Sequence, residues 1–155
     1  MSKESYNLIG FSPNKMDAKG RVAIKVEWRN KIEKLDLRLM KSTAEDQPVL
    51  RVMTDVEFDN AKQLIENFEG TPSLKRSLSR RLFKSCVEVK INDQGKLTIP
   101  KLMQEEVGIA PGDDLVLVAN DDYIDIMSKE SYAAAEAVAD EHDQMAAANA
   151  ELGIF

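Results

Sequence analysis

The sequence has very little cysteine or histidine and no long apolar run. Cys86 and His142 are the only residues of their types among 155. They cannot form an intramolecular disulfide and are too few soft ligands for an ordinary zinc site. No stretch approaches the ~20 apolar residues of a membrane-spanning helix, and no apolar run follows the charged N-terminus as in a signal peptide. We therefore expect a cytoplasmic protein with no metal site and no membrane partner.

Motifs of enzymes are also absent. The chain contains no glycine-rich phosphate loop and no motif of the nucleophile-elbow or metalloprotease kind. Acidic pairs such as Asp113-Asp114 could bind a cation, but solvated turn aspartates are the commoner case. We expect no catalytic residues, no cofactor and no small-molecule substrate, although the enzyme class remains a rival interpretation.

The charge is segmented along the chain. Overall, 21 Lys and Arg stand against 27 Asp and Glu, and the pI of about 4.9 argues at first against nucleic-acid binding. Residues 1–41, however, hold ten basic against five acidic side chains, and residues 72–101 hold eight against two. The acidic excess is confined to residues 42–71 and 102–155. The low pI therefore does not exclude two local basic surfaces.

An internal repeat coincides with the basic segments. Residues 16–24 align with residues 91–99 at an offset of 75, and residues 49–54 align with residues 123–128 at an offset of 74. Each copy is predicted to run as strand, turn, strand, short helix, strand pair and longer helix. In the first copy we expect residues 41–48 to form a polar loop between the paired strands.

The longer helices have clear start signals. Thr54 begins a capping-box pattern, Thr71 with Pro72 begins a second helix, and Ser128 begins the last one. On the second helix, basic residues recur at helical spacing, and we interpret them as a solvated face or as a partner for the acidic segments of a neighbouring subunit.

Each repeat carries a polar turn before a short strand. Gly20 and Gly95 occupy positions where a tight turn needs positive φ, and Asp17 and Asn92 are short polar residues that bond back to turn amides. These four are the predicted turn-orienting residues. We expect Asp17 to orient the turn or Arg21, because a carboxylate near phosphate is repelled.

Two units of this kind resemble a known class of DNA-binding domain. Residues 95–100, Gly-Lys-Leu-Thr-Ile-Pro, followed by a short helix and residues 108–113, are similar to AbrB/MazE/SpoVT domains. Two units in one chain resemble the MraZ family of bacterial transcriptional regulators over roughly residues 6–140. Asp17-x-x-x-Arg21 and the Arg80-Arg81-Leu82-Phe83 run are the most specific features.

The resemblance implies an α+β fold, a β-rich swapped-hairpin (AbrB-like) barrel built from two tandem repeats with peripheral helices. It also implies a nucleoid-associated regulator, a closed ring of identical subunits that binds double-stranded DNA at promoter direct repeats upstream of its own division and cell-wall operon. In the family the Asp-x-x-x-Arg turn contacts DNA, whereas the second turn here has Asn92 and Lys96. Because lysine offers only a point charge, we expect Lys96 to contact phosphate. The predicted DNA-contacting residues are Asn14, Lys15, Lys19, Arg21, Lys90, Gln94 and Lys96.

The predicted division places a first unit at residues 6–70, a linking helix and lead-in at 71–89, a second unit at 90–145 and a weakly ordered tail at 146–155. The alternative to a regulator is an AbrB/MazE-like antitoxin that binds DNA and a basic toxin. Without the repeat and the resemblance, Arg21 and Lys96 would be ordinary solvated turn residues.

Overall fold

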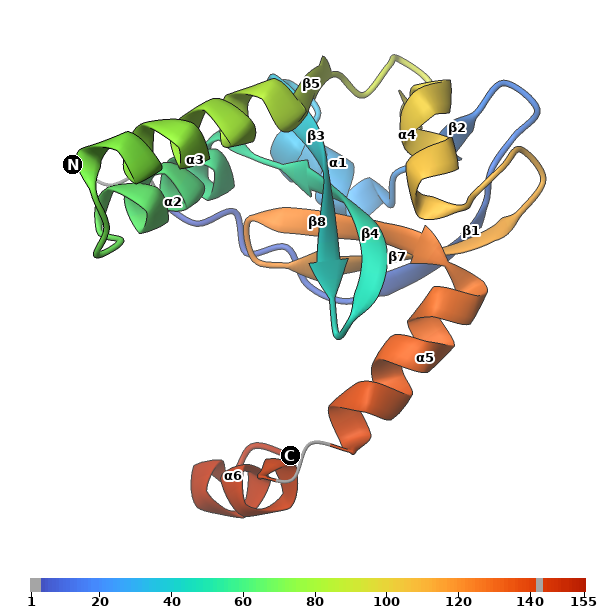
Figure 1. Ribbon diagram of the computed structural model, residues 1–155. Helices are drawn as coiled ribbons and strands as arrows, with labels where there is room; N and C mark the ends of the chain where they lie inside the picture. The colour runs from blue at the N-terminus through green and yellow to red at the C-terminus, as the bar shows by residue number, and fades with distance from the viewer. Residues whose placement is uncertain (1–3, 142–143) are drawn as a thin grey trace.

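The computed structural model describes residues 4–141 and 144–155 (Figure 1). These residues contain eight strands and six helices. The predicted α+β class is confirmed. His142 stands between two acidic residues in the sequence, and we therefore expect it to be exposed, but it lies outside the described residues. None of the helices in the described part of the chain is long and apolar enough to cross a membrane.

The elements follow the same order in both repeats, as the sequence predicts. The first repeat consists of β1 (Phe11–Lys15), β2 (Arg21–Ala23), α1 (Val26–Ile32), β3 (Leu37–Ala44), β4 (Gln47–Met53) and α2 (Asp55–Glu66). After α3 (Pro72–Ser85), the second consists of β5 (Cys86–Val89), β6 (Lys96–Thr98), α4 (Lys101–Val107), β7 (Asp114–Asn120), β8 (Tyr123–Ser128) and α5 (Lys129–Asp140). A last helix, α6 (Met145–Leu152), follows.

The predicted polar loop at residues 41–48 is wrong. β3 and β4 continue through this segment as a hairpin, with Ala44 paired to Gln47. Glu45 and Asp46 form the turn, with φ values of 47° and 64°. This part of the hairpin is mostly exposed or half-buried, so it lacks the apolar alternation that would mark it as strand. A turn with two positive-φ residues matches strand twist, and here it is made without the usual Asn-Gly.

The two repeats exchange their first strands. A six-stranded antiparallel sheet has the order β1-β7-β8-β4-β3-β5, and a separate two-stranded ribbon pairs β2 with β6. β1 thus pairs with β7 of the second repeat, whereas β5 pairs with β3 of the first. Because each sheet contains strands of both repeats, the two repeats fold together as one unit.

A pseudo-twofold axis relates the repeats. Val22 pairs with Leu97, its own equivalent at an offset of 75, and Arg51 pairs with Asp125, its equivalent at an offset of 74. A residue that faces its own repeat equivalent lies on the axis that exchanges the two copies. The axis therefore passes through the ribbon and through the β4–β8 pair.

Apolar side chains from both repeats form the main core. Val22, Leu97, Ile124 and Ile126 are fully buried within it. As the single tryptophan, Trp28 is expected from the sequence to be an anchor of the core or of an interface; it is 2% exposed and donates its indole N–H to the carbonyl of Ile9 at 2.8 Å, so it lies in the core.

The predicted helix starts are confirmed. The side chains of Thr54, Thr71 and Ser128 each accept a hydrogen bond from a backbone N–H three residues later. α2 and α3 lie side by side along one end of the sheet, while α5 leads away from it and α6 lies beyond (Figure 1). Most of the segment expected to be a weakly ordered tail is therefore helical, and no residue of α6 is buried.

An ion pair lies on the axis between β4 and β8. Arg51 Nε and Nη2 donate to the two carboxylate oxygens of Asp125 at 2.8 and 3.1 Å, and the side chains are 19% and 9% exposed. Burial raises the pKa of Asp125, and the hydrogen bonds and charge of Arg51 oppose that shift. Arg51 also stacks over the ring of Tyr123.

We expect Arg51→Met to lower the free energy of unfolding by about 3–5 kcal/mol, because it leaves a buried carboxylate unpaired. The double variant Arg51→Met/Asp125→Leu should recover most of that loss, since no buried charge remains. Urea denaturation of both variants checks this. A double variant less stable than Arg51→Met would contradict the ion-pair explanation.

Candidate functional site

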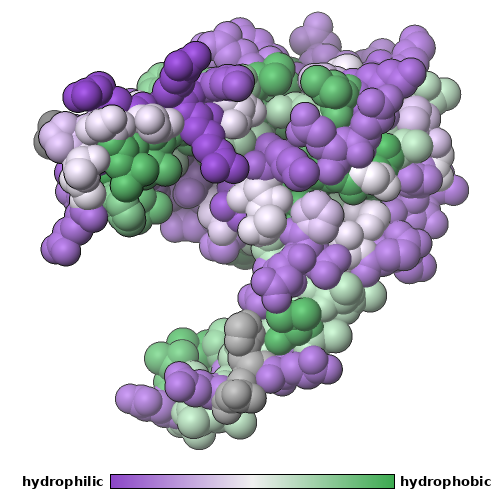
Figure 2. Space-filling view, in the orientation of Figure 1, coloured by the Kyte–Doolittle hydropathy of each residue, from purple (hydrophilic) through white to green (hydrophobic). Residues whose placement is uncertain are grey.

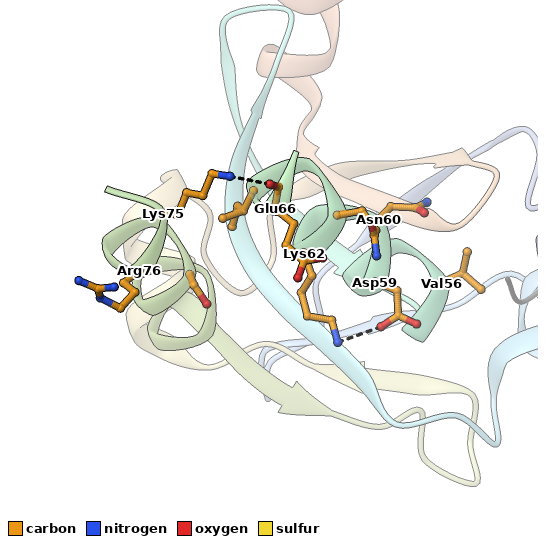
Figure 3. Close-up of a pocket in the computed structure, with 10 residues that line it drawn as sticks. Val56, Asp59, Asn60, Lys62, Glu66, Lys75 and Arg76 are labelled. Carbon is orange, nitrogen blue, oxygen red and sulfur yellow. Dashed lines mark hydrogen bonds and ion pairs between the residues drawn. The ribbon is translucent and has the colours of Figure 1, made fainter. Parts of the chain in front are cut away.

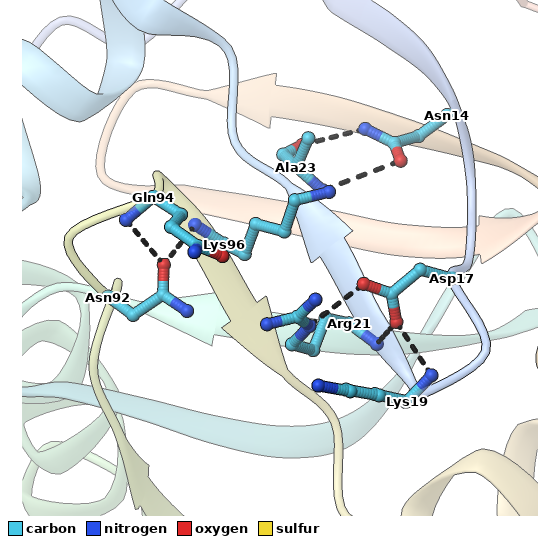
Figure 4. Close-up of polar contacts among 8 residues, drawn as sticks. All are labelled: Asn14, Asp17, Lys19, Arg21, Ala23, Asn92, Gln94 and Lys96. Atoms are coloured by element: carbon cyan, nitrogen blue, oxygen red, sulfur yellow. Dashed lines mark hydrogen bonds and ion pairs between the residues drawn. The ribbon is translucent and has the colours of Figure 1, made fainter.

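The first polar turn is held by one carboxylate. Asp17 Oδ1 accepts hydrogen bonds from the backbone N–H groups of Lys19 and Arg21, both at 2.9 Å (Figure 4). Asp17 Oδ2 accepts from Arg21 Nε at 2.8 Å. The backbone N–H of Arg21, followed by its side chain, holds the pKa of Asp17 below its ordinary value. Asp17 thus fixes both the turn and the direction of the arginine side chain.

The second turn repeats this backbone pattern with an amide. Asn92 Oδ1 accepts from the backbone N–H groups of Gln94 and Lys96, both at 2.9 Å (Figure 4). The amide has no second oxygen to accept from a side chain. The second turn is therefore ordered in the same way as the first, but Asn92 cannot pair with the lysine as Asp17 pairs with Arg21.

The glycine of each turn is covered by a helix of the other repeat. Gly20 has φ 73°, and Nε2 of Gln104 on α4 lies 2.5 Å from the place where its Cβ would be. Gly95 has φ 76°, and the guanidinium of Arg29 on α1 fills the corresponding space. A side chain at either position would meet both the unfavourable φ and a close neighbour, which accounts for the two predicted glycines.

Sequence reasoning missed Arg29 and Gln104 as parts of the site. Gln104 Nε2 donates to the carbonyl of Ile99 at 2.8 Å, whereas Arg29 Nε is buried without a hydrogen-bond partner among the described residues. The repeat could have revealed them, because the two residues are equivalent at the offset of 75. The second turn consequently has a guanidinium beside it, supplied by the first repeat.

The ribbon turns its polar face outward. Val22 and Leu97 are fully buried on one face. Residues directly opposite each other in an antiparallel pair share a face, so Arg21 with Thr98 and Lys96 with its partner Ala23 lie on the other. Arg21 and Lys96 are half-buried and related by the pseudo-twofold axis. The arrangement presents two cations on a rigid, nearly symmetric surface.

The remaining predicted contact residues fall into three groups. Lys19 and Gln94 are exposed at the two turns. Asn14 is instead engaged with the ribbon, since its Nδ2 donates to the carbonyl of Ala23 at 2.7 Å. It therefore ties β1 to β2.

Lys15 and Lys90, equivalent in the two repeats, each form an exposed ion pair. Lys15 Nζ lies 3.9 Å from Asp114, and Lys90 Nζ lies 3.1 Å from Asp36. Each pair joins one repeat to the other. Exposed ion pairs of this kind contribute little to stability, so both lysines can exchange a carboxylate for another anion.

A hollow of about 830 Å³ lies apart from this surface, between α2 and α3 (Figure 3). Two of its lysines already have partners: Lys62 pairs with Asp59 at 3.2 Å, and Lys75 donates to the carbonyl of Glu66 at 2.9 Å. Within the described residues, no three His, Cys, Asp or Glu side chains are grouped to hold a metal ion.

Several curated relatives from different bacteria share one name. A protein of Corynebacterium jeikeium named transcriptional regulator MraZ is 30% identical over 124 residues, which cover 79% of this chain and 81% of the relative. Proteins of the same name from Coxiella burnetii and Symbiobacterium thermophilum are both 27% identical, over 79% and 81% of this chain and 80% and 86% of their own lengths.

The comparisons with solved structures and with protein-family models give no further support. A solution structure of a Pyrococcus horikoshii protein covers 79% of this chain and 90% of its own at 14% identity, and its TM-score of 0.34 supports no argument about the fold. No protein-family model matches the chain.

Substitutions of Asp17 separate its hold on the turn backbone from its hold on the Arg21 side chain. Asp17→Asn should keep the turn, as Asn92 does in the second repeat, while Asp17→Ala removes the acceptor for two backbone N–H groups. We expect the free energy of unfolding at pH 7 to fall in the order wild type, Asp17→Asn, Asp17→Ala in urea titrations.

The same variants predict a pH dependence. Because the pKa of Asp17 is lowered in the folded protein, its carboxylate stabilises the fold above the ordinary value of about 3.9, and this contribution disappears as the pH falls through the folded pKa. The gap between wild type and Asp17→Asn should therefore shrink in acid. A gap that widens in acid, or equal losses in the two variants at pH 7, would argue against these roles.

Proposed function

Because the chain belongs to the MraZ family of transcriptional regulators, we propose that it regulates transcription by binding double-stranded DNA through the outer face of the β2–β6 ribbon. The observation that carries this proposal is the pair of matching turns, which hold Arg21 and Lys96 on one face about a pseudo-twofold axis. Phosphates and base edges both require donors in fixed positions, and the ribbon supplies them.

The two halves of the ribbon differ in how they would contact DNA. A guanidinium can donate two parallel hydrogen bonds to guanine, and Asp17 orients that of Arg21 through Nε. Lys96 offers a point charge suited to phosphate. Lys19 and Gln94 add exposed donors at the turns, and Lys15 and Lys90 add cations at their edges. Asn14 contributes by holding β1 against β2.

The target and setting follow from the family. We propose that the DNA sites are direct repeats in the promoter of the chain's own division and cell-wall operon, and that the protein acts in the cytoplasm, associated with the nucleoid. It acts as a regulator and not as an enzyme, with no cofactor and no small-molecule substrate. The relatives' shared name favours this function over the antitoxin alternative.

A closed ring of identical subunits fits the distribution of charge. α3 carries five Lys and Arg and no acid, whereas residues 130–155 carry six Asp and Glu and no Lys or Arg. Surfaces of opposite charge on one chain favour head-to-tail contact, which closes into a ring when the rotation allows. Several ribbons on one ring would convert later contacts into intramolecular ones and raise avidity by roughly 10²–10⁴.

We also propose that the fold is a closed swapped-hairpin barrel. The exchange of β1 and β5 supports a swapped-hairpin arrangement, in which the six-stranded sheet and the ribbon would close into one barrel. We retain the division into residues 6–70, 71–89, 90–145 and 146–155 as a description of the repeats, the linking helix and the tail.

Arg21→Ala should weaken binding to DNA from the promoter region by about 1–3 kcal/mol and relax the preference at one or more base positions, because a base-reading guanidinium is lost. Gel-shift titrations against the native site and single-base variants measure both effects. Unchanged affinity and preference would refute the assignment.

Lys96→Ala is the matched variant in the second half of the ribbon. It should weaken binding to all sequences alike and lower the slope of log affinity against log salt by about 1, as expected for the loss of one phosphate contact. A base-selective loss would overturn this division between the halves.

Light scattering of the full chain should give the mass of a closed oligomer larger than a dimer. High salt should shift the population toward smaller species, because it screens the opposite charges of adjoining subunits. A monomeric mass at low salt would contradict the ring.

A further inference from the structure

The last helix exposes apolar side chains to solvent. α6 consists mainly of alanine with Met145 and Leu152, and none of its residues is buried. Leu152, Ile154 and Phe155 are 61%, 71% and 86% exposed. Figure 2 shows hydrophobic surface over the part of the molecule where α6 lies. An apolar helix with no buried residue is a candidate interaction surface.

A groove with a matching apolar lining lies between α3 and α4. Its volume is about 560 Å³. Leu82 and Met103 form a buried floor, while Val87 and Leu102 in its walls are 39% and 67% exposed. Burial of a large, exposed apolar side chain such as Leu102 by a partner would lower the free energy, because its apolar surface would leave water.

The charges around the groove and along residues 129–155, which we call the arm, are of opposite sign. The rim carries three exposed cations, Lys41, Arg81 and Lys84, against one acid, Glu106. The segment that leads to and includes α6 carries Asp140, Glu141 and Glu151 among its acids, with no Lys or Arg after Lys129. Such complementarity selects the partner and its orientation.

The arm cannot easily reach the groove of its own chain. α5 has twelve residues, which span about 18 Å at 1.5 Å per residue, and it leads away from the sheet. In Figure 1, α6 lies beyond the far end of α5, on the opposite side of the molecule from α3 and α4. A second copy can present its groove to the arm without bending α5 back.

We propose that α6 of one copy, together with the residues that follow it, binds in the α3–α4 groove of a second copy. Leu152 and Ile154 pack against Leu102 and Val87, and the acidic residues of the arm face Arg81 and Lys84. The contact is head to tail, so every copy offers one arm and one groove. This inference rests on the proposed homo-oligomer and names the surfaces that would build it.

Three full-length variants test the apolar part of the contact by light scattering and analytical ultracentrifugation. Leu102→Glu in the groove and Leu152→Glu on the arm should each raise the dissociation constant of the oligomer about tenfold or more. Leu64→Glu is the control, since Leu64 is 74% exposed on α2 and outside the groove. It should leave the mass unchanged.

Charge exchange tests the polar part. Arg81→Glu with Lys84→Glu should weaken assembly, and adding Glu141→Lys with Glu151→Lys should restore it at least in part. Rescue of this kind cannot arise from damage to the fold. Failure of the rescue would count against the proposed pairing.

Cross-linking distinguishes a second copy from the arm's own groove. In a Cys86→Ser background, one chain carries Leu102→Cys and another carries Ile154→Cys. Mixed under oxidising conditions, they should form a heterodimeric disulfide in high yield, whereas the control pair Leu64→Cys and Ile154→Cys should not.

The possible results distinguish a failure of the α6 docking from a failure of the ring. A monomeric wild type would defeat the ring and the docking together. An oligomeric wild type whose mass is unaffected by Leu102→Glu and Leu152→Glu, with no cross-link between 102 and 154, would overturn the docking and leave the ring standing.

Discussion

The pairing of β2 with β6 is the constraint on which the rest of the structure depends. Val22 and Leu97 face each other at the pseudo-twofold axis and are fully buried, so the opposite face of a three-residue ribbon must turn outward. Each repeat also closes the turn of the other: the backbone N–H of Ile24 donates to the carbonyl of Gly95, and that of Ile99 donates to the carbonyl of Gly20, both at 2.9 Å. Because these bonds are reciprocal, each turn is held by the other repeat as well as by its own Asp17 or Asn92.

The approximate symmetry makes the differences between the halves informative. One turn has a carboxylate that orients an arginine, and the other has an amide beside a lysine. The helix residue that covers each glycine also differs: Gln104 donates to a carbonyl, while the buried Nε of Arg29 finds no acceptor in the described part of the chain. The same backbone thus holds two different sets of donors. This difference is the basis of our proposal that one half of the ribbon reads bases and the other binds phosphate.

The sequence predicts local structure well here and long-range pairing poorly. Thr54 and Thr71 predict where helices begin, and the repeated glycine turns predict where strands end. These signals can be read locally, because a cap or a positive-φ glycine affects only the backbone within a few residues. The exchange of β1 and β5 could be expected only from the family resemblance and not from local patterns, because their registers join residues about a hundred and about fifty positions apart. The hairpin at Glu45-Asp46 was missed because its turn lacks glycine. Arg29 was missed because a helical arginine usually signals a solvated face, and only the packed structure places it on Gly95.

The net charge of −6 conceals a second basic surface, α3, that competes with the ribbon as an explanation of DNA binding. In our account α3 meets the acidic arm of another subunit and the ribbon meets DNA. The most direct test is ultraviolet cross-linking of the full-length protein to DNA from its own promoter region, with the linked peptides identified by mass spectrometry. We expect cross-links in residues 17–23 and 92–98. Cross-links confined to residues 72–85 would contradict it.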